Sequence, residues 1–133
     1  MKFLLDTHIW IWSLIEPSRL SRRVLAALED PRNELWLSPI SIWELIVLSQ
    51  KKRIRLHGDA DSWVREKLNT APFQQAPLTY EVALETGRLQ LAHRDPADRF
   101  LVATAKIFEL TLITADQRLM KLREIPVLAN QAH

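Results

Sequence analysis

The segment Lys2-Phe3-Leu4-Leu5-Asp6-Thr7-His8 decides how the rest of the 133-residue chain is interpreted. Its short apolar run predicts a buried strand over 2–5, and this run stops at an acid. Near the other end of the chain, Leu112-Ile113-Thr114-Ala115-Asp116 repeats the same order, a strand-forming run followed by an acid. We therefore expect two buried strands, each with an aspartate just beyond its carboxyl end.

Between these two segments the expected elements alternate. Further strands are predicted at 34–38 and 126–128. Helices are predicted at 8–15, 21–29, 39–52, 59–68 (or from 61), 79–87, 96–108 and 116–122. Such alternation with short connections predicts an α/β fold, with a mainly parallel central sheet flanked by helices, in a single domain over residues 1–133. Ligands of open parallel sheets bind beyond the carboxyl ends of the strands, where Asp6 and Asp116 are expected.

Composition excludes several classes of protein. The chain has no cysteine, which rules out disulfides, thiolate metal sites and a cysteine nucleophile. No apolar run approaches the roughly 18 residues of a membrane span, and an acid at position 6 interrupts any apolar signal segment. We expect a protein that contacts no membrane and lies in the cytoplasm. The net charge of +2 says little about nucleic acid, although basic residues cluster at 19–23 and 51–55.

Two more acids stand in unusual contexts. Glu44 interrupts the apolar helix segment Ser41-Ile42-Trp43-Glu44-Leu45, and Asp98 lies in the first turn of the helix expected at 96–108. Taken singly, Asp98 fits the positive end of a helix dipole, Asp116 fits a helix cap and Asp6 fits a turn. Glu44 is harder to explain, because a lone buried carboxylate is costly unless it is paired or binds a cation.

Taken together, the four acids predict a site for a hard cation. Carboxylate oxygens suit Mg²⁺ or Mn²⁺, and one or two such ions would relieve the repulsion between neighbouring carboxylates. Divalent ions also lower the pKa of bound water and stabilise the leaving oxygen of a phosphodiester. This chemistry points to a metal-dependent nuclease.

These motifs resemble those of the PIN-domain ribonucleases, in particular the VapC-type toxins. The resemblance rests on Leu4-Leu5-Asp6-Thr7-His8, Ser41-Ile42-Trp43-Glu44-Leu45, His93-Arg94-Asp95-Pro96-Ala97-Asp98-Arg99 and Leu112-Ile113-Thr114-Ala115-Asp116. Their order and spacing over nearly the whole chain make it specific. It implies a compact domain that cleaves RNA with Mg²⁺ or Mn²⁺, pairs with a small antitoxin protein and forms a homodimer.

The resemblance also assigns site residues. It places the catalytic and metal-binding carboxylates at Asp6, Glu44, Asp98 and Asp116, and hydroxyl positions at Thr7 and Thr114. Asp95 competes with Asp98 for one ligand position. We prefer Asp98 because of its distance from the following Ala103-Thr104-Ala105 run, and interpret Asp95 as the cap of a helix that begins at Pro96.

Residues around the acids have weaker assignments. Arg99 is interpreted either as a phosphate ligand or as part of a salt bridge, while His8 and His93 suit either proton transfer or packing. Of the five tryptophans, Trp63 is expected at the surface, and the others in the core or a dimer interface. The latter are Trp10, Trp12, Trp36 and Trp43.

Two other functions remain open. One is a catalytically inactive PIN-like module that binds RNA or protein. The other, a metal-dependent phosphatase, is weaker because Asp6-Thr7 lacks a second aspartate two residues on.

Overall fold

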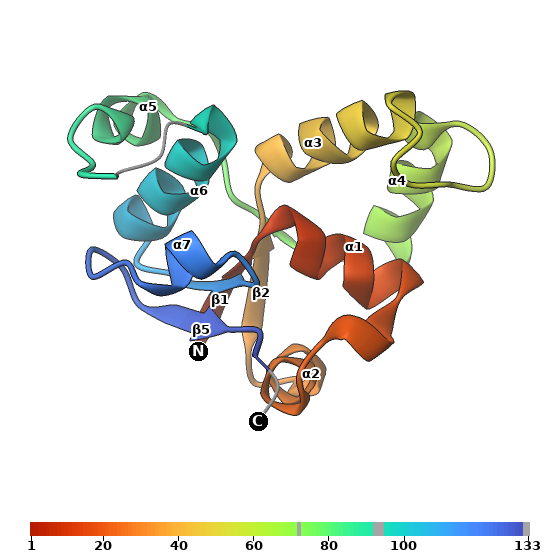
Figure 1. Cartoon of the computed structure of the whole chain (residues 1–133), viewed down its shortest axis with the longest axis horizontal. Coiled ribbons are helices and arrows are strands. Elements are labelled where there is room, and N and C mark those ends of the chain that lie inside the picture. Colours follow the sequence, from red (N-terminus) through yellow and green to blue (C-terminus); the bar gives the residue numbers. More distant parts are fainter. Residues whose placement is uncertain (72, 92–94, 132–133) are drawn as a thin grey trace.

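The computed structural model describes residues 1–71, 73–91 and 95–131. Within them, five parallel strands form one sheet in the order β3-β2-β1-β4-β5 (Figure 1). The strands are β1 (Lys2–Leu5), β2 (Glu34–Leu37), β3 (Gln74–Gln75), β4 (Thr111–Thr114) and β5 (Val127–Ala129). The helices are α1 (Thr7–Ile15), α2 (Arg22–Glu29), α3 (Pro39–Gln50), α4 (Ala60–Thr70), α5 (Tyr80–Thr86), α6 (Pro96–Ile107) and α7 (Gln117–Met120), with a short 3-10 helix η1 at Pro17–Arg19.

This architecture confirms the predicted α/β/α fold with a parallel sheet. Alternate residues of the two central strands point to opposite faces, as the pleat of a strand requires. Leu4 and Leu112 pack into a core with residues of α5, α6 and α7. Phe3, Leu5 and Ile113 pack into a second core with residues of α1, α2, α3 and α4. Helices therefore cover both faces of the sheet (Figure 1).

Two elements were not predicted. The edge strand β3 has only Gln74 and Gln75, both exposed, and pairs with Trp36 and Leu37 of β2. Two polar residues carry no apolar alternation, so only the neighbouring strand defines them as a strand. The helix η1 was also missed, because its three residues are too few to produce a helical pattern.

The tryptophans differ in part from expectation. Trp10 is fully buried, as predicted, but Trp63 is only 7% exposed, so its predicted surface position is wrong. Trp63 and Val64 form the buried side of α4. Trp63 therefore packs into the core to which α1 and α3 also contribute. Trp43 is 57% exposed on α3, which excludes it from the core of this chain.

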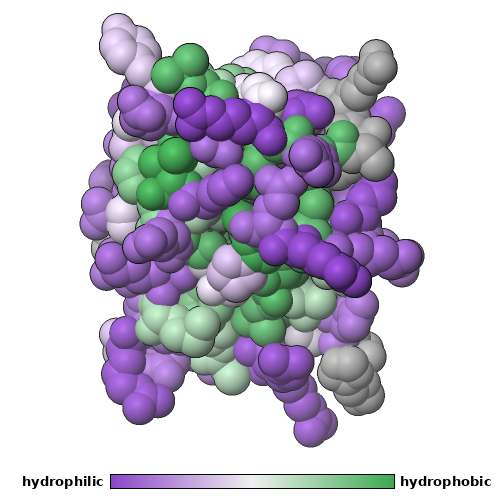
Figure 2. Space-filling model, turned by 90° about the vertical axis from the view of Figure 1, so that its left-hand side faces the viewer, coloured by the Kyte–Doolittle hydropathy of each residue, from purple (hydrophilic) through white to green (hydrophobic). Residues whose placement is uncertain are grey.

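The surface carries scattered apolar side chains. On the side of the molecule that includes α5, hydrophobic groups are exposed between hydrophilic ones (Figure 2). Exposed apolar residues include Leu78, Tyr80 and Leu84, of which the last two lie on α5. None of the described helices combines the length and apolarity that crossing a bilayer demands.

Candidate active site

Asp6 lies where the central strand becomes a helix. Its amide donates to the carbonyl of Ile113 (2.9 Å), which extends the pairing of β1 with β4 by one residue. Its carboxylate caps α1 by accepting from the amide of Thr7 (2.8 Å) and also accepts from the Thr114 hydroxyl (2.6 Å). Asp6 is only 9% exposed, so these donors fix the orientation of a buried carboxylate.

Glu44 reaches the same region from α3. The Thr7 hydroxyl donates to Glu44 Oε1, and lies 2.9 Å from the hydroxyl of Ser41, one turn earlier on α3. Thr7 and Ser41 are both buried, so this contact joins α1 to α3 beneath the carboxylate. Thr7 therefore orients both Asp6, through its amide, and Glu44, through its hydroxyl.

Two acids come from the start of α6. Asp95 caps the helix by accepting from the amide of Ala97 (3.0 Å), and Pro96 occupies the first helical position, as predicted. Asp98 lies in the first turn and is 7% exposed. Asp95 also lines the site, so the choice between Asp95 and Asp98 as a ligand stays a prediction.

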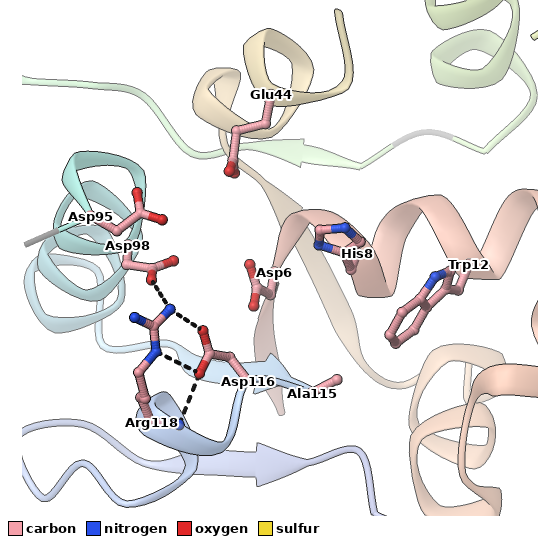
Figure 3. Close-up of a pocket in the computed structure, with 9 residues that line it drawn as sticks. All are labelled: Asp6, His8, Trp12, Glu44, Asp95, Asp98, Ala115, Asp116 and Arg118. Carbon is pink, nitrogen blue, oxygen red and sulfur yellow. Dashed lines mark hydrogen bonds and ion pairs between the residues drawn. The ribbon is translucent and has the colours of Figure 1, made fainter. Parts of the chain in front are cut away.

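Asp116 follows β4 and caps the short helix α7. Its Oδ1 accepts from the amide of Arg118 (2.8 Å), and the Arg118 guanidinium binds the same carboxylate through Nη2 (2.9 Å). The same Nη2 lies 3.7 Å from Asp98 Oδ2. Arg118 therefore bridges the acids of α6 and of the β4 end (Figure 3).

These side chains converge on one open cleft of about 390 Å³ (Figure 3). Its lining includes all four predicted carboxylates, which come from positions 6 to 116 of the chain. The remaining lining residues are His8, Trp12, Asp95, Ala115 and Arg118. The cleft lies at the carboxyl ends of β1 and β4, where parallel sheets bind their ligands.

Burial and mutual repulsion raise the pKa of three of the carboxylates. Burial is the main cause of the raised pKa of Asp6, which the hydrogen bonds from Thr114 and Thr7 partly offset. Burial likewise raises the pKa of Glu44, with Asp6 and Asp95 adding to it. Burial, then the charges of Asp95, Asp6, Asp116 and Glu44, raises the pKa of Asp98 to about 7. The folded chain therefore concentrates negative charge here at a cost in free energy.

The carboxylates that line the cleft are of the right chemical type for a hard divalent cation, but their side chains lie too far apart to surround one. Every acidic donor is a carboxylate oxygen, the ligand type that Mg²⁺ and Mn²⁺ prefer. Within residues 1–71, 73–91 and 95–131, no three acidic or histidine side chains stand close enough to hold an ion. Protein donors already hold these acids: Thr7 binds Glu44, and Arg118 binds Asp98 and Asp116. An ion would have to compete with Arg118.

The other predicted residues have mixed outcomes. Thr7 and Thr114 both lie at the site, where their hydroxyls bind carboxylates. Contact of either hydroxyl with a substrate stays a prediction. Arg99 is not among the described residues that line the cleft, and its Nη1 donates to the carbonyl of Thr86 (2.8 Å). His8 lines the cleft, whereas His93 lies outside the described residues.

Arg118 is the main lining residue that the sequence reasoning missed. A signal for it exists: Asp116-Gln117-Arg118 has the same spacing as Asp30-Pro31-Arg32. In both segments the arginine amide, Nε and Nη2 all donate to the aspartate two residues earlier. The ion pair at the cleft is therefore a local turn motif that also reaches Asp98.

Comparisons with known proteins agree with this geometry. A family model described as PIN domain matches residues 3–125. The chain is 35% identical over 119 residues to Ribonuclease VapC22 of Mycobacterium tuberculosis (strain ATCC 25618 / H37Rv), covering 87% of this chain and 88% of that protein.

Solved structures share the fold. VapBC2 from Rickettsia felis, bound to a DNA fragment from its promoter, aligns with a TM-score of 0.75 at 15% identity, covering 97% of this chain and 98% of that one. A toxin–antitoxin complex from Klebsiella pneumoniae aligns with a TM-score of 0.65 at 23% identity, covering 98% of each chain.

The raised pKa of Asp98 predicts a pH-dependent stability in the presence of a chelator. Because the folded state binds this proton more tightly than the unfolded chain, the free energy of unfolding should fall as pH rises from about 4 to about 7. Asp98→Asn cannot ionise and should reduce that fall by on the order of 1–2 kcal/mol. Chemical denaturation at about pH 5 and about pH 8 measures the difference. Asp61→Asn, at an exposed position of α4, is the control and should keep the wild-type pH dependence. Equal pH dependence in wild type and Asp98→Asn would contradict the prediction.

Proposed function

The chain belongs to the PIN-domain family, and on this basis we propose that it is an endoribonuclease, dependent on Mg²⁺ or Mn²⁺, and the toxin of a toxin–antitoxin pair. The identity to a VapC ribonuclease over most of both chains supports RNA as the substrate. A cytoplasmic location is part of the proposal, since RNA and an antitoxin would be met there.

One observation carries the proposal. Asp6, Glu44, Asp98 and Asp116 come from four separate segments of the chain and line one cleft. Burial and repulsion raise the pKa of three of them, Asp6, Glu44 and Asp98. A protein that only binds RNA gains nothing from this arrangement, because neighbouring carboxylates raise the free energy of the fold and repel a polyanion. The arrangement becomes favourable when a divalent cation binds there.

The proposed roles follow from the contacts. Asp6, Glu44, Asp98 and Asp116 would hold the one or two ions. A bound ion of this type lowers the pKa of water and stabilises charge on phosphate oxygens. Thr114 and the Thr7 amide orient Asp6, and the Thr7 hydroxyl orients Glu44. Burial and neighbouring charges raise the pKa of Asp98 to about 7, so Asp98 would have to lose its proton to serve as a ligand. Hydrolysis in the open cleft would add water to phosphorus in line and break one ester P–O bond, so that a ribose oxygen leaves as an alcohol.

Loss of a carboxylate should abolish cleavage while the fold survives. Asp6→Asn and Asp98→Asn should each lower the rate of RNA cleavage by at least about 100-fold, as expected when a ligand of a catalytic ion is lost. The assay is cleavage of a mixed single-stranded RNA pool with Mg²⁺ or Mn²⁺, with circular dichroism to verify folding. Asp61→Asn on α4 is the control and should cleave as wild type does.

This assay also decides between Asp95 and Asp98. If Asp95→Asn abolishes RNA cleavage and Asp98→Asn still cleaves, the ion ligand is Asp95 and not Asp98. Cleavage by the wild type that persists in excess chelator would refute the metal-dependent mechanism. Failure of the folded wild type to cleave RNA with either ion would favour the inactive binding module.

The native Arg118 should lower the affinity of the cleft for a divalent ion, because its guanidinium forms ion pairs with the carboxylates of Asp98 and Asp116. Arg118→Gln should therefore increase the rise in melting temperature caused by Mn²⁺ by about 3 °C or more, measured by calorimetry. Arg32→Gln is a matched control, since Arg32 binds Asp30 through the same three donors. An equal Mn²⁺ effect in the two variants would show that Arg118 does not compete with the ion.

The antitoxin is proposed from the neighbours, which are toxin–antitoxin complexes. The chemistry of the cleft supports it, because an arginine or lysine from a partner could supply the positive charge that the acids lack. The exposed Trp43 precedes Glu44 on α3 and offers apolar surface to a partner. The homodimer implied by the family is likewise a proposal, and the exposed Tyr80 and Leu84 of α5 are available to it.

Expression of the chain alone should slow growth, and co-expression with the adjacent reading frame should relieve this effect. Asp6→Asn should not slow growth, because it removes a carboxylate proposed to hold the ion. Growth curves of both proteins, each with and without the neighbouring gene and at matched soluble levels, make the comparison. Equal toxicity of wild type and Asp6→Asn would separate growth arrest from this site. Absence of toxicity in soluble wild type would remove the toxin assignment.

A further inference from the structure

A nuclease cleft lined by five carboxylates needs cations that contact the RNA backbone. The arginine expected to do so from the sequence, Arg99, donates to the Thr86 carbonyl and does not line the cleft among the described residues. Arg118 lines the cleft but binds Asp98 and Asp116. Neither arginine is therefore placed to contact a phosphate that flanks the scissile bond.

The aromatic wall of the cleft leads to such a side chain. His8 and Trp12 lie one turn apart on α1, with ring centroids 5.6 Å apart, and line the cleft away from Asp98 and Asp116 (Figure 3). The guanidinium carbon of Arg19 lies 4.2 Å from the centroid of the Trp12 ring. A cation–π contact of this kind does not use the guanidinium N–H groups as hydrogen-bond donors, so these groups can donate to phosphate oxygens.

The backbone that carries Arg19 is fixed by contacts from distant parts of the chain. Asn130, just after β5, donates to the Arg19 carbonyl (3.0 Å) and accepts from the Ser21 amide (2.6 Å). Between these two contacts, Leu20 is buried in the core beneath α1 and α2. Asn130 thus fixes the backbone of Arg19, and Trp12 holds its guanidinium. Arg19 therefore loses less conformational entropy when it binds a ligand.

The acidic partner of Arg19 would not prevent such binding. Glu16 Oε2 lies 3.5 Å from Arg19 Nη1, and more than half of each side chain is exposed. Ion pairs at such exposed positions contribute little, so a phosphate can replace the glutamate at small cost. This differs from Arg118, whose partners Asp98 and Asp116 are mostly buried.

We propose that Arg19, held against Trp12, binds a backbone phosphate of single-stranded RNA that flanks the phosphodiester at the carboxylates. Trp12 is then a positioning residue that acts through Arg19. The inference rests on the proposed ribonuclease function, and it adds a substrate contact just outside the cleft, behind the wall formed by His8 and Trp12.

The test is equilibrium binding of a short, fluorescently labelled single-stranded RNA over a series of salt concentrations. The full-length chain carries Asp98→Asn throughout, so that the RNA stays intact. Arg19→Gln should weaken binding about fivefold and lower the slope of log affinity against log salt by about 0.7, the value for one phosphate contact on a single strand. Arg19→Lys keeps a cation and should keep most of the slope. The matched control is Arg65→Gln on α4, which removes an exposed, ion-paired arginine of equal charge and should leave the slope unchanged.

Trp12 is tested in the same assay. Trp12→Phe keeps an aromatic face and should keep the slope, whereas Trp12→Leu should lower it as Arg19→Gln does. When Trp12→Leu is combined with Arg19→Gln, it should cause no further change in slope, since both substitutions remove the same contact. A full slope in folded Trp12→Leu would overturn the positioning role of Trp12.

The outcomes separate this inference from the proposed function. Equal binding and slopes in Arg19→Gln and Arg65→Gln, or no salt-dependent RNA binding by the parent protein, would overturn the Arg19 contact. Metal-dependent cleavage by the wild type would then leave the ribonuclease proposal standing. A lowered slope in Arg19→Gln together with a wild type that never cleaves RNA would support the Arg19 contact and reject catalysis.

Discussion

The parallel pairing of β1 with β4 is the constraint on which the candidate site depends. The register sets Leu5 against Ile113, and the amide of Asp6 continues that ladder by donating to the Ile113 carbonyl. The next residue of β4, Thr114, then lies where its hydroxyl reaches the Asp6 carboxylate. A slip of one residue would turn Leu5 and Ile113 away from their core and separate the Asp6–Thr114 pair. Core packing and site geometry are thus set by one register.

Repulsion between neighbouring carboxylates is the second constraint on the site. The fold places carboxylates together and offsets the repulsion with hydroxyl donors, a helix-capping amide and one arginine. The arginine comes from a turn motif that also forms at Asp30 and Arg32, two residues that do not line the cleft. Local geometry thus supplies a counter-charge for the cleft without a dedicated element. The same geometry gives the chain an internal competitor for any cation that binds there.

Much of the site could be predicted because its signals are local. Asp6 and Asp116 each follow an apolar strand, and Glu44 interrupts an apolar helix. These local contexts mark the acids as candidates, and their order along the chain, which resembles the PIN-domain motifs, joins them into one site. Side-chain direction could not be predicted so well. Arg99 follows Asp98 in sequence, but adjacent helix positions point about 100° apart, and its guanidinium reaches α5 instead. Trp63 was misplaced because most residues of α4 are polar, and only packing against the rest of the chain turns Trp63 and Val64 to the core. Such errors arise where tertiary packing, which no local pattern records, decides.

The contact between Asn130 and Arg19 has a consequence for the order in which the protein becomes functional during synthesis. These residues are 111 positions apart, so the segment that carries Arg19 emerges from the ribosome long before the residue that fixes it. The set of carboxylates is likewise complete only late in synthesis. Asp116 follows β4, and β4 is made long after its partner strand β1, which Asp6 follows. Contacts of such separation form slowly, and only after most of the chain is present. A nascent or prematurely released chain therefore has neither a complete acidic cleft nor a fixed Arg19, and the ribosome making it is not exposed to a finished nuclease.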